Sequence, residues 1–199
     1  MYGISANGVV IAKYAAPITV RNNKPVLISD TLSLRRHVRR IAAQRWEIDT
    51  NLEPLGEGED AIALFIHTTL NGLHTKIQAV MPQPVAVIRK IELDGKVGPI
   101  TLAGATIKGS SSIAVTSNIK VGTFVAFSGH GKVYLVTSKT SETITVYPNL
   151  VTGVPSGNRL FHEDDVLLQC YYDTGTVSGM VFTDGILMDL GSVKLVEAL

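Results

Sequence analysis

Short segments rich in β-branched and aromatic residues, each ended by a turn-forming residue, recur along most of this chain. Glycine, asparagine, aspartate and proline separate these segments at close intervals. Branched and aromatic side chains pack well on a pleated surface, and turn residues end a strand, so the pattern indicates many short β-strands. The sequence therefore predicts a mainly β fold, and the departures from the pattern define its organisation.

Residues 44–52 show the clearest alternation. Gln44, Trp46, Ile48, Thr50 and Leu52 occupy every second position, and more polar residues lie between them. Because successive side chains of a strand point to opposite faces, this spacing predicts a half-buried strand. Trp46 is expected to anchor it in the core.

One segment follows helical spacing instead. Between Glu59 and Asn71 the apolar residues recur every three or four positions, acidic residues occupy the first turn, and Gly72 follows the last. These are the signals of an amphipathic helix with its start and its end. The sequence therefore predicts one α-helix here, followed by a strand at 75–81 and a stiff exit at Pro82-Gln83-Pro84.

Residues 85–172 read as strands without a helical pattern. The strand candidates are 85–92, 113–115, 123–127, 132–138, 143–147 and 165–172. Five or six strands in a segment of this length fit a small barrel, for which the oligonucleotide/oligosaccharide-binding (OB) type is a good candidate. We therefore predict a discontinuous first domain, 1–84 plus 173–199, of β-sandwich or split-barrel type, with an OB-like barrel inserted at 85–172.

Charge and cysteine content exclude several classes of protein. The formal net charge is +1, 18% of residues are charged and 45% are hydrophobic, so the chain should bury enough apolar surface to fold. This charge provides no global attraction for nucleic acid, and no segment approaches the roughly 18 apolar residues of a membrane helix. Cys170 is the single cysteine, which excludes a disulfide framework and a cysteine-based zinc site. We expect neither a membrane nor a specific nucleic acid as partner.

The strongest local charge feature is a group of five arginines within eleven residues: Arg35, Arg36, Arg39, Arg40 and Arg45. If 32–41 is extended, Arg36 and Arg40 share one face with Val38, and Arg39 lies on the other. One interpretation is a charged edge strand that discourages unwanted pairing. A sharper one is a subunit interface in which guanidinium groups meet a neighbour's carboxylates. DNA binding is weaker, because interleaved aromatic residues are missing.

Asp173-Thr174-Gly175 follows an apolar segment, as the catalytic loop of aspartic proteases does. That chemistry requires two such aspartates sharing a proton, so only a homodimer with one loop per chain would fit. The same tripeptide is also a common turn. We keep the protease as a remote alternative and otherwise predict a protein without catalytic, cofactor or metal residues.

A second alternative is a carbohydrate-binding module for host-surface attachment. It would act through the inserted barrel, where Tyr134, Tyr147 and Phe161 are available as aromatic platforms. Core packing explains these three residues at least as well.

Several short segments together resemble the distal tail proteins of long-tailed bacteriophages (siphophages). In the first half these are residues 39–47 (RRIAAQRWE) and 51–55 (NLEPL), then the acidic-started helix and the strand ending at Met81-Pro82. In the second half they are 118–122 (NIKVG), 124–127 (FVAF), 132–136 (KVYLV), 146–150 (VYPNL) and 197–199 (EAL). Together these segments cover most of the chain.

The resemblance implies a structural protein of the virion. A β-rich tail-ring domain with an inserted OB-like barrel would form a hexameric ring between tail tube and tail tip or baseplate. Its partners would be other copies of the chain, the tail tube protein and the tail hub or tip proteins. It would be found in the phage tail, and in the host cytoplasm during assembly, and it would perform no catalysis.

Overall fold

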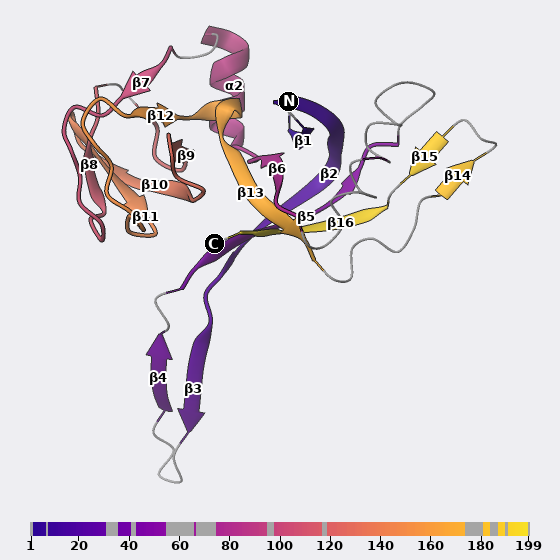
Figure 1. Cartoon of the computed structure of the whole chain (residues 1–199), viewed down its shortest axis with the longest axis horizontal. Coiled ribbons are helices and arrows are strands. Elements are labelled where there is room, and N and C mark those ends of the chain that lie inside the picture. The colour runs from indigo at the N-terminus through magenta and orange to yellow at the C-terminus, as the bar shows by residue number, and fades with distance from the viewer. Residues whose placement is uncertain are drawn as a thin grey trace.

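The structure is a computed structural model, and it confirms the mainly β fold (Figure 1). It describes residues 2–6, 8–30, 36–40, 43–54, 66, 75–94, 98–116, 119–173, 181–183, 187–189 and 191–198. The helix expected at 59–71 falls outside these residues, apart from Ile66. Two larger β units and a two-stranded hairpin account for most of the described strands.

The first unit is a closed six-stranded barrel. Its strands are β1 (Gly3–Ala6), β2 (Val9–Asn23), β5 (Arg45–Leu52), β6 (Ile77–Val80), β13 (Leu167–Tyr172) and β16 (Ser192–Glu197). They follow the order β1-β2-β5-β16-β13-β6, and pairing of β1 with β6 closes the barrel. The barrel therefore combines strands from the first 80 residues with strands from the last third of the chain.

The alternation predicted for 44–52 is confirmed in β5. Trp46, Ile48, Thr50 and Leu52 are buried, whereas Arg45 and Asn51 are exposed. Ile48 and Leu195, opposite each other on β5 and β16, are fully buried in the barrel core. Glu47, at an alternate position, is buried rather than exposed, because polar side chains of neighbouring strands cover it.

The second unit is a six-stranded sheet in the order β7-β12-β9-β10-β11-β8. Its strands are β7 (Ile100–Thr101), β8 (Ser112–Ala114), β9 (Phe124–Phe127), β10 (Val133–Lys139), β11 (Thr143–Tyr147) and β12 (Arg159–Phe161). A bridge between Leu102 and Val115 joins the ends of the two outer strands, so the sheet curls almost into a barrel. Its interior is an apolar cluster that includes Tyr134, Phe127 and Ile144.

Two expectations for the middle of the chain are wrong. Residues 85–94 form helix α2 (Val85–Asp94) rather than a strand, and the carbonyl of Pro84 accepts the first helical N–H groups, from Val87 and Ile88. β-Branched residues favoured a strand, but burial of Val87 against the second unit overrides this propensity. The strand predicted at 165–172 does form as β13, but it pairs with β6 and β16 and therefore belongs to the closed barrel.

A short 3-10 helix, η1 (Glu163–Asp165), leads from the second unit back to β13. Two further short strands, β14 (Val181–Thr183) and β15 (Leu187–Asp189), pair only with each other among the described strands.

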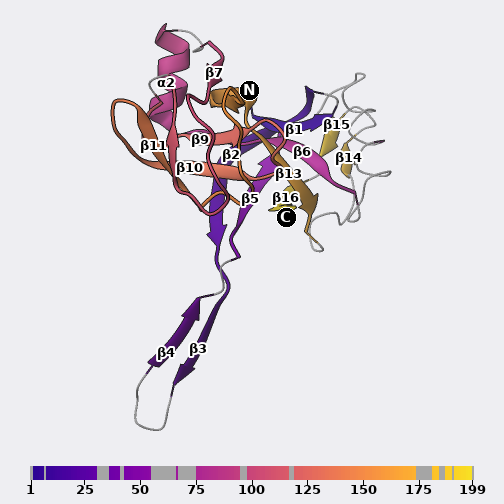
Figure 2. The ribbon, with the colours of Figure 1, turned by 60° about the vertical axis from the view of Figure 1, so that its left-hand side comes forward.

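Strands β3 (Val26–Asp30) and β4 (Arg36–Arg40) form a hairpin that extends the ladder of β2 and β5 away from both units. The two views agree that it projects from the body of the molecule (Figures 1 and 2). We call this hairpin the arm.

Candidate functional site

One face of the arm carries exposed apolar side chains. Ile28 lies opposite Val38 in the β3–β4 register, and Val26 lies two positions before Ile28. Opposite residues of an antiparallel pair share a face, so these three side chains lie together. They are 57%, 52% and 41% exposed for Ile28, Val38 and Val26 respectively. A two-stranded hairpin is marginal in water, so an uncovered face of this kind is a candidate contact surface.

The arginines divide between the arm and the barrel. Arg36, Arg39 and Arg40 lie on β4, so residues 36–40 have the extended form that the sequence interpretation assumed, and Arg36 occupies a position on the face of Val38. Arg45 belongs instead to β5, where its Nε lies 3.1 Å from Oε1 of the buried Glu47. Arg35 falls outside the described residues. The structure therefore places three of the five arginines on β4, next to the residues of the exposed apolar face in sequence.

Charge is distributed unevenly between the arm region and the rest of the chain. Residues 24–45 contain six of the 18 lysines and arginines and one of the 17 acidic residues, a net charge of +5. The remaining residues contain twelve basic and sixteen acidic residues, a net charge of −4. Opposite net charges attract, so the arm region and the rest of the chain are electrostatically complementary.

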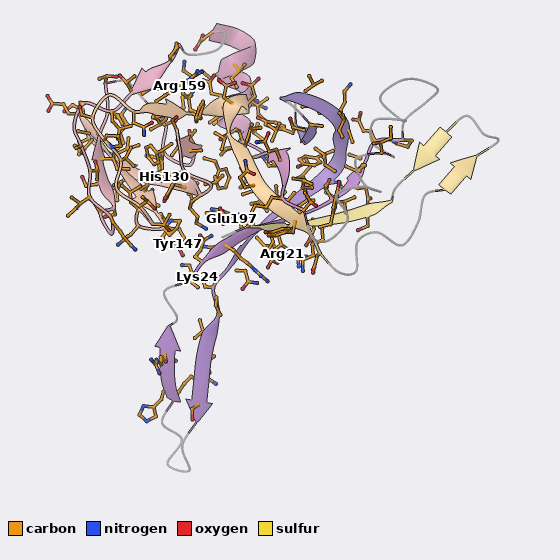
Figure 3. All side chains as sticks on the ribbon, viewed as in Figure 1. Arg21, Lys24, His130, Tyr147, Arg159 and Glu197 are labelled. Atoms are coloured by element: carbon orange, nitrogen blue, oxygen red, sulfur yellow. The ribbon has the colours of Figure 1, made fainter. Side chains whose placement is uncertain are left out.

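Both legs of the arm contact the second unit where the arm begins. The β2–β5 ladder ends at the pair Asn23 and Arg45. The next residue on each strand, Lys24 or Gln44, begins one of the two chain segments that lead into the arm, which we call its legs. Lys24 and Gln44 therefore lie at the same level of the ladder. The Lys24 ammonium lies 4.2 Å from the centre of the Tyr147 ring (Figure 3). Lys132, just before β10, donates from its Nζ to the backbone carbonyl of Gln44 over 2.8 Å. We call Lys24 and Gln44 the neck of the arm.

A buried ion pair adjoins the neck, because Lys132, which contacts Gln44, also contacts Glu197. The Lys132 ammonium contacts the Glu197 carboxylate, which also accepts the backbone N–H groups of Trp46 and Val133 over 2.9 and 3.1 Å. Burial lowers the pKa of Lys132, and the contact with Glu197 opposes that shift. The Trp46 indole N–H donates to the carbonyl of Val133 over 2.8 Å. The network therefore joins β5 and β16 of the barrel to β10 of the second unit.

Apolar contacts and one glutamine complete the junction of the two units. The rings of Trp46 and Phe124 meet edge to face at 5.2 Å. The Gln83 amide accepts the Phe124 N–H over 3.0 Å and donates to the carbonyls of Phe124 and Glu163 over 3.1 and 2.8 Å. The junction is therefore packed and hydrogen-bonded like a protein interior.

Sequence reasoning missed the neck and the ion pair. Lys132 and Glu197 are 65 positions apart, and each stands in an ordinary strand segment. No local spacing links them, so the sequence contains no signal for the contact. The apolar face of the arm had only a weak signal, because residues 26–28 are a continuous apolar run (VLI) close to the arginine group.

The aromatic residues considered for carbohydrate binding do not form an open platform. Tyr134 is fully buried, and its hydroxyl accepts the N–H of Val151 over 3.3 Å. Tyr147 and Phe161 are partly buried and pack against the barrel core. A cavity between α2 and the second unit measures only about 20 Å³, room for about one water molecule.

The aspartate considered for protease chemistry is held by a lysine. Asp173 Oδ2 lies 2.7 Å from Lys194 Nζ, and this contact raises the pKa of Lys194. Thr174 and Gly175 fall outside the described residues. Among the residues that the structure describes, no group of three or more histidine, cysteine or acidic side chains is placed to hold a metal ion.

No known family model matches the sequence, and a search of curated proteins finds no significant match. Within the described part of the chain, no helix combines the length and the apolar character needed to cross a membrane.

Proposed function

We propose that this chain is a structural subunit of the tail of a long-tailed bacteriophage. Six copies would form a ring that joins the tail tube to the tail tip or baseplate, without catalysis. The observation that carries the proposal is the projecting arm, which has an exposed apolar face and three arginines on its strand β4. The resemblance of the sequence to distal tail proteins supplies the tail setting and the sixfold ring.

The arm supports assembly from identical copies. A hairpin with an exposed Ile28–Val38 pair gains stability when a second surface covers that pair. The body of the same protein provides a surface of opposite net charge, −4 against +5 in residues 24–45. The partner that fits the arm is therefore another copy of this chain.

A ring follows from the asymmetry of that contact. The arm of one copy meets the body of the next, so the two surfaces in contact are different. Such head-to-tail contacts generate a closed ring when the rotation between neighbours closes, and a filament when it does not. A closed ring matches the open end of a tube, which is the setting that the resemblance implies.

The direct test examines purified phage tails and the assembly of arm variants. We expect the protein in intact tails, and we expect Ile28→Asp and Arg39→Glu to block its incorporation while the variants remain folded by circular dichroism. Matched controls on the second unit are Ile107→Asp, where the side chain is 80% exposed, and Lys108→Glu. They should assemble normally.

Two results would contradict the proposal. One is absence of the protein from purified tails. The other is normal tail assembly by both arm variants.

A further inference from the structure

We propose that the second unit acts as a clamp that fixes the direction of the arm, with Tyr147 and Lys132 holding the two legs at Lys24 and Gln44. The clamp consists of contacts within one chain and does not depend on assembly. Only its purpose, the formation of a ring, rests on the proposed function. It assigns a role to residues 100–161 that requires no ligand.

The first leg is held by a charge on an aromatic ring. Lys24 follows the last residue of β2, and its ammonium lies 4.2 Å from the centre of the Tyr147 ring. Tyr147 is the last residue of β11, and it packs against the barrel core, so the ring is supported from behind. A cation above an aromatic face is attracted by the ring quadrupole. This contact ties the leg that leads into β3 to the end of β11.

The second leg is held by a buried ammonium group. Lys132 donates to the carbonyl of Gln44, the residue that precedes β5. Its side chain is only 3% exposed and is held in turn by the Glu197 carboxylate. Because the ammonium is enclosed by these acceptors, it has little freedom to move away. This contact ties the leg that leads out of β4 to the start of β10.

Two contacts on opposite strands constrain a direction better than one. Beyond the neck, the two arm strands pair with each other, from Val26 opposite Arg40 to Asp30 opposite Arg36. A single attachment would leave the hairpin free to bend about that point. Attachments at Lys24 and Gln44, at one level of the ladder, oppose bending toward either strand.

A fixed arm direction matters for a head-to-tail contact. The angle at which the arm leaves the body determines the rotation from one copy to the next. If that angle varied, the same contact would lead to open or irregular assemblies. On the proposed function, the clamp favours closure into a ring.

The test measures the direction of the arm in the full chain by spin-label distances. Cysteines replace Ser29 on the arm and Ser138 on β10, both of them exposed positions. Native Cys170 is buried and burial raises the pKa of its thiol, so it should remain unlabelled. Measurements at high dilution report on single molecules rather than on assemblies.

We expect one narrow distance distribution in the parent protein. Lys24→Met removes the cation and Tyr147→Leu removes the ring. Each variant should raise the fraction of molecules whose spin-label distance falls outside the parent distribution about fivefold. Tyr147→Phe retains the ring and should match the parent. Arg159→Met removes another cation above a ring, 4.9 Å from Phe161 and away from the arm, and should also match it.

Unchanged distributions in both Lys24→Met and Tyr147→Leu would overturn the clamp. Equal broadening in Arg159→Met would overturn it as well, because the effect would then not depend on the neck. Neither result depends on assembly, so failure of the clamp and failure of the ring proposal are distinguishable.

Discussion

The ammonium group of Lys132 contacts the carboxylate of Glu197 in the interior of the protein, where the two side chains are 3% and 0% exposed. Each partner makes further hydrogen bonds, Lys132 to the Gln44 carbonyl and Glu197 to two backbone N–H groups. A buried ion pair recovers its desolvation cost only with such additional partners. This pair therefore connects the second unit, the C-terminal strand of the barrel and the neck of the arm.

Removing one member of the pair should destabilise the protein strongly. Lys132→Met leaves the Glu197 carboxylate buried without its counter-charge, and we expect a loss of about 3–5 kcal/mol in the free energy of unfolding. The double variant Lys132→Met with Glu197→Gln should lose less than the sum of the two single variants, because no charge remains buried. Urea unfolding of the four proteins gives the double-mutant cycle. Strict additivity would show that the two side chains do not interact energetically.

Alkaline pH should destabilise the barrel through its buried acids. Burial raises the pKa of the Cys170 thiol above its usual 9.0, so the folded state retains a proton that the unfolded state loses. This contribution is fully present below pH 9.0 and is lost as the pH rises above it, by about 1.4 kcal/mol per pH unit. Burial likewise raises the pKa values of Tyr14 and Tyr172, whose contributions are lost above pH 10.0.

The measurement compares the parent protein with Cys170→Ala by urea unfolding at successive pH values. The difference in unfolding free energy should be constant between about pH 6 and 8 and should decrease above pH 9.0. Lys132 and the tyrosines are present in both proteins, so their titrations cancel to first order. A difference that stays constant up to pH 10.0 would contradict the assignment.

Glycine at position 3 should be required for the close approach of strands β1 and β2. A Cβ at Gly3 would overlap the carbonyl oxygen of Ala12 and lie 2.7 Å from Cγ1 of Val10, on the adjacent strand β2. Gly3→Ala should therefore cost about 1–3 kcal/mol, as overpacking does. Gly104→Ala is the matched control, because a Cβ there meets no atom within 4 Å. Thermal unfolding of the two variants checks this, and equal melting temperatures would disprove the close approach.

Local patterns predicted some elements correctly. The alternation at 44–52 appears as β5, and the strand at 75–81 appears as β6. Residues 36–40 have the extended form that the sequence interpretation assumed, with Arg36 and Val38 on one face. These successes have one cause, since the period of side chains and the torsions of turn residues act over a few neighbouring positions.

The errors arose where local and tertiary preferences compete. Residues 85–94 have a composition that suits a strand, yet they pack as helix α2 against the second unit. The segment 167–172 reads as a strand in any context, and only its pairing with β6 and β16 assigns it to the barrel. Which strand a segment pairs with depends on distant residues, which local periodicity does not report.

For the candidate site, too, local sequence patterns determined some features and the tertiary structure determined the others. The amino-acid sequence by itself determined a mainly β chain with little net charge and a concentration of arginine near residue 40. Only the tertiary structure decided that β3 and β4 project as an arm, that Ile28 and Val38 face solvent together, and that Lys132 meets Glu197 behind its neck. The physical reason is that burial and ion pairing depend on which surfaces the folded chain brings together, and here those surfaces come from segments up to 151 positions apart.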